Sequence, residues 1–193
     1  MSEQQALYDV IVIGSGPGGE GAAMKAVKAG KRVAVIEEKP LVGGNCTHTT
    51  TIPSKALRQA IQQMIDTGSY TTTNYQQLLR SAESVITQQV TLRTSFYERN
   101  QVDVITGRGS FVDAYTIAVM TPNGVTKRYR TAYFIIATGA RPYHPSDIDF
   151  THPRILDSDS VLTYKGNPRS ITIYGAGVIG CEYASIFRGL RIK

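Results

Sequence analysis

Two glycine-rich turns carry the strongest chemical signal in the sequence, and the first is the more informative. Gly14, Gly16 and Gly19 form a Gly-x-Gly-x-x-Gly pattern. The first glycine of such a pattern permits a tight turn, the second lets the backbone approach a pyrophosphate, and the third lets a helix pack on a strand. Glu37 follows about 20 residues later, where an acid accepts hydrogen bonds from a ribose diol. Such an acid disfavours a 2′-phosphate, so this turn is predicted to bind FAD or NAD rather than NADP.

The same pattern recurs near the end of the chain, at Gly175, Gly177 and Gly180. It predicts a second nucleotide site, which would take NAD or NADP. The strand that would carry the ribose-reading residue of this second site would lie beyond Lys193. The sequence therefore does not separate NAD from NADP as its ligand.

Composition limits the partners and the compartment. Cys46 and Cys181 are the only cysteines, too few for a disulfide scaffold, and they are not proposed as a pair; this favours the cytoplasm. No apolar run reaches the ~18 residues of a membrane span. The net charge of +6 comes from scattered Lys and Arg residues without interleaved aromatic side chains. No membrane, nucleic-acid or metal partner is therefore predicted.

The glycine turns must be positioned by βαβ units, in which a strand leads into each turn and a helix leaves it. Residues 8–13 predict an apolar strand, residues 19–29 a helix of small side chains, and residues 32–36 a second, parallel strand. Around the second turn, a strand is expected over 170–174 and a helix over 181–188. Both turns are thus predicted at the carboxyl end of a buried strand.

Between the two turns the hydrophobic period changes twice. Residues 54–66 and 75–100 carry apolar side chains at helical spacing. Proline and aspartate punctuate residues 142–159, which indicates a linker. Between the second helix and this linker the pattern is that of short strands, expected at 102–105, 111–112, 115–120, 125–129 and 133–137.

This order of features resembles the pyridine nucleotide-disulfide oxidoreductases over nearly the whole chain. The resemblance rests on the first glycine turn with Glu37, on residues 43–55 with Gly-Gly-x-Cys and then Ile-Pro-Ser-Lys, on Ala-Thr-Gly before residue 140, and on the second glycine turn followed by Glu182. It implies an α/β fold: a Rossmann-like FAD-binding domain with a parallel sheet, a β-meander and a helical pair, plus the start of a second, incomplete NAD(P)-binding Rossmann unit. The implied boundaries are 1–145 for the FAD-binding domain, 146–168 for a linker and 169–193 for the NAD(P)-binding unit.

In that family a cysteine, four residues and a second cysteine lie beside the flavin. Here Cys46 has Thr51 at the second position, and a lone thiol cannot close an internal disulfide. The resemblance therefore implies that the flavin gives its hydride to something other than a protein disulfide. Residues 46–48 together with Thr51, and residues 96–100, 141–145 and 183–189, are similar to members that move hydride between NADPH and NAD. This implies an FAD-dependent NAD(P) transhydrogenase activity of the Si-specific type.

The resemblance also implies roles for single residues. Lys55 would lie near flavin N5, where a cation stabilises negative charge on the reduced ring, and Glu182 would pair with it beside the nicotinamide. Cys46 would line the flavin as the third catalytic candidate; the alternative is a small buried residue with no redox role. The implied contacts are Gly14, Gly16, Gly19, Glu37, Glu38, Gly43, Gly44, Cys46, Lys55, Gly109, Ala137, Thr138 and Gly139 for FAD, and Gly175, Gly177 and Gly180 for the nicotinamide nucleotide.

Members of the family run to more than twice this length, and they contain a Gly-Asp segment that touches the ribitol of FAD. No Gly-Asp dipeptide occurs in this sequence. We therefore expect an N-terminal fragment, inactive by itself, of an enzyme that works as a homo-oligomer on NAD(H) and NADP(H). Two alternatives stay open: a lipoamide dehydrogenase-like disulfide reductase, and a non-catalytic, truncated flavin-binding module.

Overall fold

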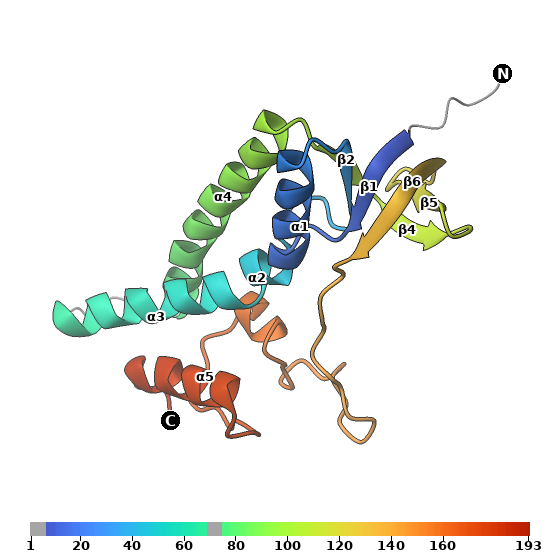
Figure 1. Cartoon of the computed structure of the whole chain (residues 1–193). Coiled ribbons are helices and arrows are strands. Elements are labelled where there is room, and N and C mark those ends of the chain that lie inside the picture. Colours follow the sequence, from blue (N-terminus) through green and yellow to red (C-terminus); the bar gives the residue numbers. More distant parts are fainter. Residues whose placement is uncertain (1–6, 69–74) are drawn as a thin grey trace. The chain divides into compact units, whose positions relative to one another are not determined.

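The computed structural model describes residues 7–68 and 75–193, and the chain divides into two compact units (Figure 1). Met1–Cys46 and Gln89–Ala140 form the first unit. Thr47–Gln88 and Arg141–Lys193 form the second. The chain therefore passes between the units several times.

The first unit is built on a six-stranded mixed sheet with the strand order β3-β2-β1-β6-β5-β4. The strands are β1 (Leu7–Ile13), β2 (Val33–Glu37), β3 (Asp103–Thr106), β4 (Arg108–Phe111), β5 (Thr116–Met120) and β6 (Thr126–Ile136). β1, β2, β3 and the second half of β6 run parallel, while β4, β5 and the first half of β6 form an antiparallel meander. The predicted α/β fold, with a parallel sheet and a meander, is confirmed.

β1 and β2 are covered on both faces. Successive side chains of a strand point to opposite faces, so Val12 of β1 packs with Ala23 of helix α1 (Pro17–Lys28), whereas Ile11 packs with Ile117 of β5 on the other face. Parallel strands buried on both faces read as continuous apolar runs. This is why both strands are recognisable in the sequence.

The meander differs in detail from the sequence prediction. Separate strands are expected at 125–129 and 133–137, but one continuous strand, β6, covers both. The change occurs at Arg130, which pairs with β1 on one side and with β5 on the other. β4 also lies earlier than the expected strand at 111–112. A single strand can change partners without a break in its backbone. The first half of β6 is mostly exposed and polar, so its side chains lack the alternation that would reveal one long strand.

The strand expected over 170–174 does not form. Ile171 N–H donates to the carbonyl oxygen of Lys193 at 2.8 Å, and Lys193 N–H donates to that of Arg169 at 3.2 Å. A strand needs a ladder of such bonds along several residues. Here both bonds involve the same residue, Lys193. Residues 170–174 therefore have an irregular conformation.

The second unit is helical. It contains α3 (Thr51–Asp66), the 3-10 turn η1 (Ser160–Thr163), α5 (Val178–Gly189) and the residues of α4 (Tyr75–Arg99) up to Gln88. α3 begins earlier than its predicted start at residue 54, and α4 agrees closely with the predicted helix. Their apolar faces form one core cluster, made of Leu57, Ile61, Met64, Tyr75, Leu78, Ala82, Val161, Tyr183, Ile186 and Phe187.

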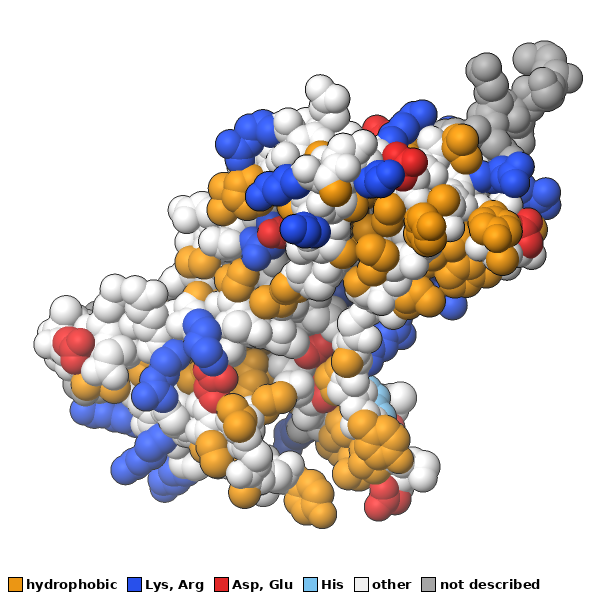
Figure 2. All heavy atoms as spheres, in the orientation of Figure 1, with side chains coloured by type: hydrophobic (Ala, Val, Ile, Leu, Met, Phe, Trp, Pro, Cys, Tyr) orange, Lys and Arg blue, Asp and Glu red, His pale blue; other side chains and the backbone are white. Residues whose placement is uncertain are grey.

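The short helix α2 (Gly44–His48) contains the point where the chain first leaves the first unit. No helix within residues 7–68 and 75–193 combines the length and the apolar character of a membrane span. In the same residues, no group of three or more His, Cys, Asp or Glu side chains is arranged to hold a metal ion. On the face seen in Figure 2, Lys and Arg side chains occur in separate groups, while apolar side chains gather over the meander.

Candidate cofactor site

The first glycine turn connects β1 to α1, and two of its glycines are required by close contacts. Gly14 has φ +102°, and a Cβ there would lie 2.3 Å from the carbonyl oxygen of Ala137. A Cβ on Gly19 would lie 1.9 Å from the carbonyl oxygen of Gly14. Gly16 is the N-cap of α1 and supplies no side-chain cap. The first amides of the helix thus lack a side-chain acceptor, which is the arrangement that binds a phosphate.

A second stretch of backbone lies against this turn. Gly44 has φ +59°, and a Cβ on it would lie 2.7 Å from Cα of Gly16. Gly43 is also in the left-handed region, with φ +116°. The predicted contacts of the first turn and of residues 43–44 are therefore brought together in the first unit. The two backbone segments are packed directly against each other, so a side chain larger than that of glycine does not fit at Gly44.

Glu37, the predicted ribose acceptor, ends β2 with its side chain buried. Its Oε2 accepts hydrogen bonds from Ser15 N–H at 3.0 Å and from Ser15 Oγ–H at 2.5 Å, and its Oε1 accepts from Lys39 N–H at 2.9 Å. Gly43 N–H in turn donates to Ser15 Oγ at 2.9 Å. Three separate segments meet at one serine hydroxyl. Sequence reasoning missed Ser15, whose only local signal is a hydroxyl between two glycines.

Asn45 forms a second link that the sequence does not reveal. Its Oδ1 accepts from Lys39 Nζ at 2.8 Å, and its Nδ2 donates to the carbonyl oxygen of Ala140 at 2.8 Å. Ala140 directly follows the predicted contacts Thr138 and Gly139, and Gly139 has φ +75°. These bonds tie the segment before Cys46 to the residues that follow β6. Glu38, also a predicted contact, is exposed directly after β2.

Gly109 occupies a different environment from the other predicted contacts. It lies in β4, where a Cβ would be 2.8 Å from Cδ1 of Ile117 and 3.7 Å from Cγ2 of Ile36. Its small size therefore lets Ile117 pack on the sheet. Its proposed approach to adenine stays a prediction.

Cys46 is half-buried in α2, and Thr51 is the first residue of α3. Cys46 and Cys181 are both free thiols. Between Cys46 and Thr51, Thr47 is fully buried and its hydroxyl has no hydrogen-bond partner among the described residues. Thr49 Oγ donates to Asp159 Oδ2 at 3.3 Å. Residues 46–51 therefore contain a single thiol, that of Cys46, and cannot form a disulfide within the segment.

Lys55 and Glu182 meet in the second unit, as the resemblance implies. Lys55 Nζ lies 2.5 Å from Glu182 Oε1, with the lysine side chain 62% exposed and the glutamate 19% exposed. One helical turn further along both helices, Arg58 hydrogen-bonds Ser185. The pairing is thus part of the contact between α3 and α5. An ion pair this open to solvent contributes little to stability.

The second glycine turn repeats part of the geometry of the first, without a preceding strand and without a close contact at its first glycine. Gly175 has φ +127°, Gly177 is the N-cap of α5 without a side-chain cap, and a Cβ on Gly180 would lie 2.1 Å from the carbonyl oxygen of Gly175. The N-caps of α1 and α5 have nearly equal dihedrals, φ −65° and ψ 178° against φ −74° and ψ 179°. Both helices therefore begin at an extended glycine N-cap without a side-chain cap, and binding of a phosphate at either of them stays a prediction. Cys181, at the start of α5, donates to the carbonyl oxygen of Ala176.

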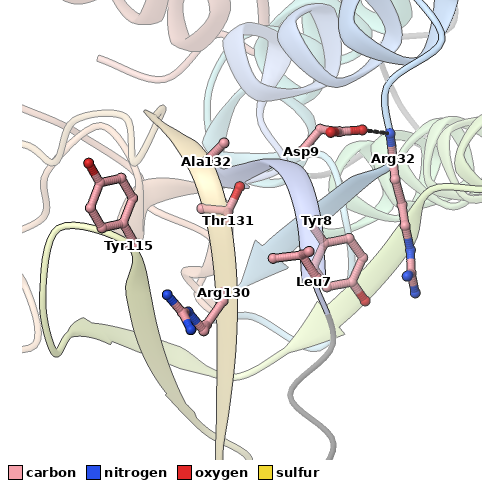
Figure 3. A pocket seen from close by; sticks show the side chains of 8 residues that line it. All are labelled: Leu7, Tyr8, Asp9, Arg32, Tyr115, Arg130, Thr131 and Ala132. Atoms are coloured by element: carbon pink, nitrogen blue, oxygen red, sulfur yellow. Dashed lines mark hydrogen bonds between the residues drawn. The ribbon is translucent and has the colours of Figure 1, made fainter.

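A cavity of about 540 Å³ lies elsewhere in the first unit (Figure 3). It is at the amino end of β1, with Leu7, Tyr8 and Arg130 among its lining residues. Open α/β sheets bind their ligands at the carboxyl ends of the strands. This cavity is thus separate from the glycine turns and is not the predicted nucleotide site.

The residues of the first turn fit the ADP half of a flavin dinucleotide. Glycine is required where the backbone segments of the turn approach one another: a Cβ would lie 2.3 Å from the carbonyl oxygen of Ala137 at Gly14 and 2.7 Å from Cα of Gly16 at Gly44. The start of α1 offers amides for a pyrophosphate. Glu37 is a buried carboxylate at the end of the second strand, in the position that accepts from a ribose.

The comparisons with known proteins agree with this geometry. The sequence profile described as pyridine nucleotide-disulphide oxidoreductase matches residues 8–193. The soluble pyridine nucleotide transhydrogenase of Stutzerimonas stutzeri is 54% identical over 96% of this chain and 42% of its own length. That of Pectobacterium atrosepticum is 54% identical over 99% of this chain and 43% of its own length.

Solved structures give the same fold. A Cu(II) complex of the HOCl-induced flavoprotein disulfide reductase RclA from Escherichia coli superposes with a TM-score of 0.84 and 30% identity, over 98% of this chain and 42% of the other. A second structure of RclA, not described as a copper complex, gives a TM-score of 0.83 and 28% identity, over 95% of this chain and 40% of the other. The chain thus spans about 42% of the length of the relatives that it matches.

Proposed function

Because the chain belongs to the pyridine nucleotide-disulphide oxidoreductase family, we propose that it is part of a flavoenzyme that moves hydride between NADPH and NAD. The relatives named as soluble transhydrogenases support this. The observation that carries it is Thr51. With threonine there, Cys46 has no second thiol in its segment, and both cysteines of the chain are free. Without a disulfide, the acceptor of the electrons must be a second nicotinamide or another external molecule.

FAD, when bound, would supply the two-electron carrier for this reaction. The start of α1 would receive the pyrophosphate and Glu37 the adenosine ribose. Residues 43–46 would line the flavin. The turn at residues 175–180 would bind the nicotinamide nucleotide, and because it is one turn, donor and acceptor nucleotides would use it in succession.

Lys55 and Glu182 have an electrostatic role in this proposal. The lysine cation would stabilise negative charge that develops on the reduced ring. Glu182, 2.5 Å from Lys55 Nζ, would hold the lysine side chain in one orientation. Cys46 would contact the ring without changing its oxidation state. No general base is required, because hydride moves from one nicotinamide to another.

A flavoprotein disulfide reductase is the second candidate. The observation in its favour is the structural match to RclA at 30% identity. Thr51 opposes it, because thiol–disulfide exchange between the flavin and a substrate passes through a pair of protein thiols. The identity to the transhydrogenases is also higher, at 54%.

An anaerobic reductive titration distinguishes the two functions. The protein, expressed from its complete gene and loaded with FAD, is titrated with dithionite while the flavin absorbance is followed. A flavin alone takes up two electrons, whereas a flavin with a redox-active disulfide takes up four. Two electrons per flavin are expected. Uptake of four would contradict the assignment of Thr51 and favour a disulfide reductase.

The proposal extends to the working form of the enzyme. We expect a cytoplasmic homo-oligomer with Si-specific transfer, in which the 193 residues alone give no turnover. Sedimentation velocity checks the assembly, and deuterated NADPH checks the face of transfer. Turnover by the isolated 193-residue chain would contradict the last point.

A further inference from the structure

Ser15 lies at the meeting point of three segments in the first unit. It is 0% exposed and sits between Gly14 and Gly16 of the first glycine turn. Its hydroxyl donates to Glu37 Oε2 at 2.5 Å and accepts from Gly43 N–H at 2.9 Å. Its own N–H donates to the same Glu37 oxygen at 3.0 Å. The serine thus connects the glycine turn, the end of β2 and the segment that leads to Cys46.

These bonds occupy the Glu37 carboxylate unevenly. A carboxylate offers about four lone-pair sites, two on each oxygen. Oε2 receives two donors, both from Ser15, and Oε1 receives one, from Lys39 N–H. Among the described residues, one acceptor position therefore remains without a donor, and it is on Oε1. At 7% exposure, Glu37 cannot satisfy this position freely with bulk water.

We propose that Ser15 is a positioning residue that aims this remaining acceptor of Glu37 at the adenosine ribose. The inference rests on the proposed function, because it takes FAD as the ligand. Ser15 saturates Oε2 and so fixes the rotation of the carboxylate. A ribose hydroxyl then meets an oriented, buried acceptor, and a hydrogen bond to a charged acceptor is stronger than one between neutral groups.

The same hydroxyl couples ribose recognition to the segment before Cys46. Gly43 N–H donates to Ser15 Oγ, and the adjacent Gly44 lies against Gly16 so closely that a Cβ would be 2.7 Å from its Cα. Without the serine hydroxyl, the Glu37 carboxylate loses one donor and the Gly43 amide loses its acceptor. Both ends of the dinucleotide site are therefore expected to loosen together.

The test is the discrimination between FAD and a FAD analogue whose adenosine ribose lacks both hydroxyls. Their dissociation constants are measured by calorimetry on the flavin-free protein expressed from its complete gene. For the unaltered protein, FAD should bind about 10- to 100-fold more tightly than the analogue, the range given by one charge-assisted hydrogen bond. In Ser15→Ala this ratio should fall to about threefold or less. Loosening of the segment before Cys46 weakens FAD and the analogue alike, but only FAD also loses the oriented ribose acceptor.

The matched control is Thr131→Val, which removes another buried hydroxyl of the first unit, one that donates to the nearby carbonyl of Tyr133 within the same strand. Its ratio should equal that of the unaltered protein. If Ser15→Ala does not fold, Ser15→Cys carries the same measurement, because the thiol has a similar volume and is a weak donor. A second readout is the exchange of the Gly43 amide hydrogen in the flavin-free protein, which should be markedly faster in the Ser15 variant.

The outcomes separate the inference from the function on which it rests. An unchanged ratio in the Ser15 variant, with normal binding of FAD, would overturn the role of Ser15 and leave the proposed function intact. Failure of the unaltered protein to bind either nucleotide would overturn the proposed function. A fall in the ratio together with faster exchange at Gly43 would establish both the orientation of Glu37 and its coupling to the segment before Cys46.

Discussion

Lys55 of α3 and Glu182 of α5 form an ion pair with 2.5 Å between Nζ and Oε1. The two residues are far apart in the sequence. One helical turn further along the same two helices, Arg58 hydrogen-bonds Ser185. The pair therefore has a structural frame and a chemical role that can be tested separately.

The chemical role predicts a kinetic defect in Lys55→Met. Methionine keeps the length of the side chain but removes the charge that would stabilise the reduced flavin, so flavin reduction by NADPH should slow by about 100-fold. Stopped-flow absorbance measures this rate. The control is Arg58→Met, which removes a neighbouring cation from the same helix. Equal rates in Lys55→Met and the unaltered protein would remove Lys55 from the reaction.

The structural frame predicts that apolar packing, not the ion pair, holds α3 and α5 together. Ile186 is fully buried in the core cluster, and Ile186→Ala should lower the free energy of unfolding by about 2–5 kcal/mol. Glu182→Gln should lower it by less than about 1 kcal/mol, because the ion pair is open to solvent. Urea denaturation compares the two. A larger loss for Glu182→Gln would show that the ion pair is the main contact.

The first glycine turn predicts opposite effects for two substitutions in α1. Gly19→Ala places a Cβ 1.9 Å from the carbonyl oxygen of Gly14, so the turn must open, and both stability and FAD binding should fall sharply. Gly21→Ala meets no atom within 4 Å and should raise stability by about 0.5–1 kcal/mol, since alanine favours the helix. Thermal unfolding with and without FAD measures both. Equal behaviour of the two variants would show that the turn is not held as described.

Two buried tyrosines offer a matched pair of hydroxyl deletions. Tyr97 is 1% exposed, and its hydroxyl has no hydrogen-bond partner among the described residues. Tyr97→Phe should therefore leave stability unchanged or raise it. Tyr75 donates its hydroxyl to the carbonyl oxygen of Val161 at 2.5 Å, so Tyr75→Phe should cost about 1–2 kcal/mol. Urea denaturation checks both, and a clear loss for Tyr97→Phe would mean that its hydroxyl has a partner.

Asp157 predicts a loss of stability in acid. Burial of its carboxyl would raise the pKa, but hydrogen bonds from Ser160 and His144 outweigh burial and lower the pKa from 3.8 to about 2. Because the pKa is depressed in the folded state, the stabilisation is present above about pH 4 and is lost as the pH falls through about 2, by on the order of 1–2 kcal/mol. Asp157→Asn should flatten the dependence of stability on pH in this window. An unchanged slope would contradict the assignment.

The sequence predicts β1, β2 and the two glycine turns from short-range patterns of residues. Continuous apolar runs predict β1 and β2, and glycine spacing predicts where each turn begins, because these signals depend on residues close in sequence. The partner change inside β6 does not follow, since it depends on strands from two parts of the chain. The expected strand at 170–174 has the composition of a strand but only a single bridging residue, Lys193.

The residues of the candidate site also divide into those that the sequence predicts and those that only the structure reveals. Glu37 and the glycines are predictable because the fingerprint fixes their spacing. Ser15 and Asn45 are not, because their partners lie in other segments: Ser15 bonds Glu37 and Gly43, and Asn45 bonds Ala140. Short polar side chains carry no period, so only the folded structure reveals which of them organise a site.

The measurement that tests the central claim most directly is an acceptor comparison on the protein expressed from its complete gene. NADPH is supplied as donor, and a thio-NAD analogue, lipoamide and glutathione disulfide are offered separately as acceptors. The account predicts reduction of the thio-NAD analogue and none of the two disulfides, because Thr51 leaves Cys46 without a second thiol. Turnover with either disulfide would contradict it and would place the reactive thiols elsewhere in the enzyme.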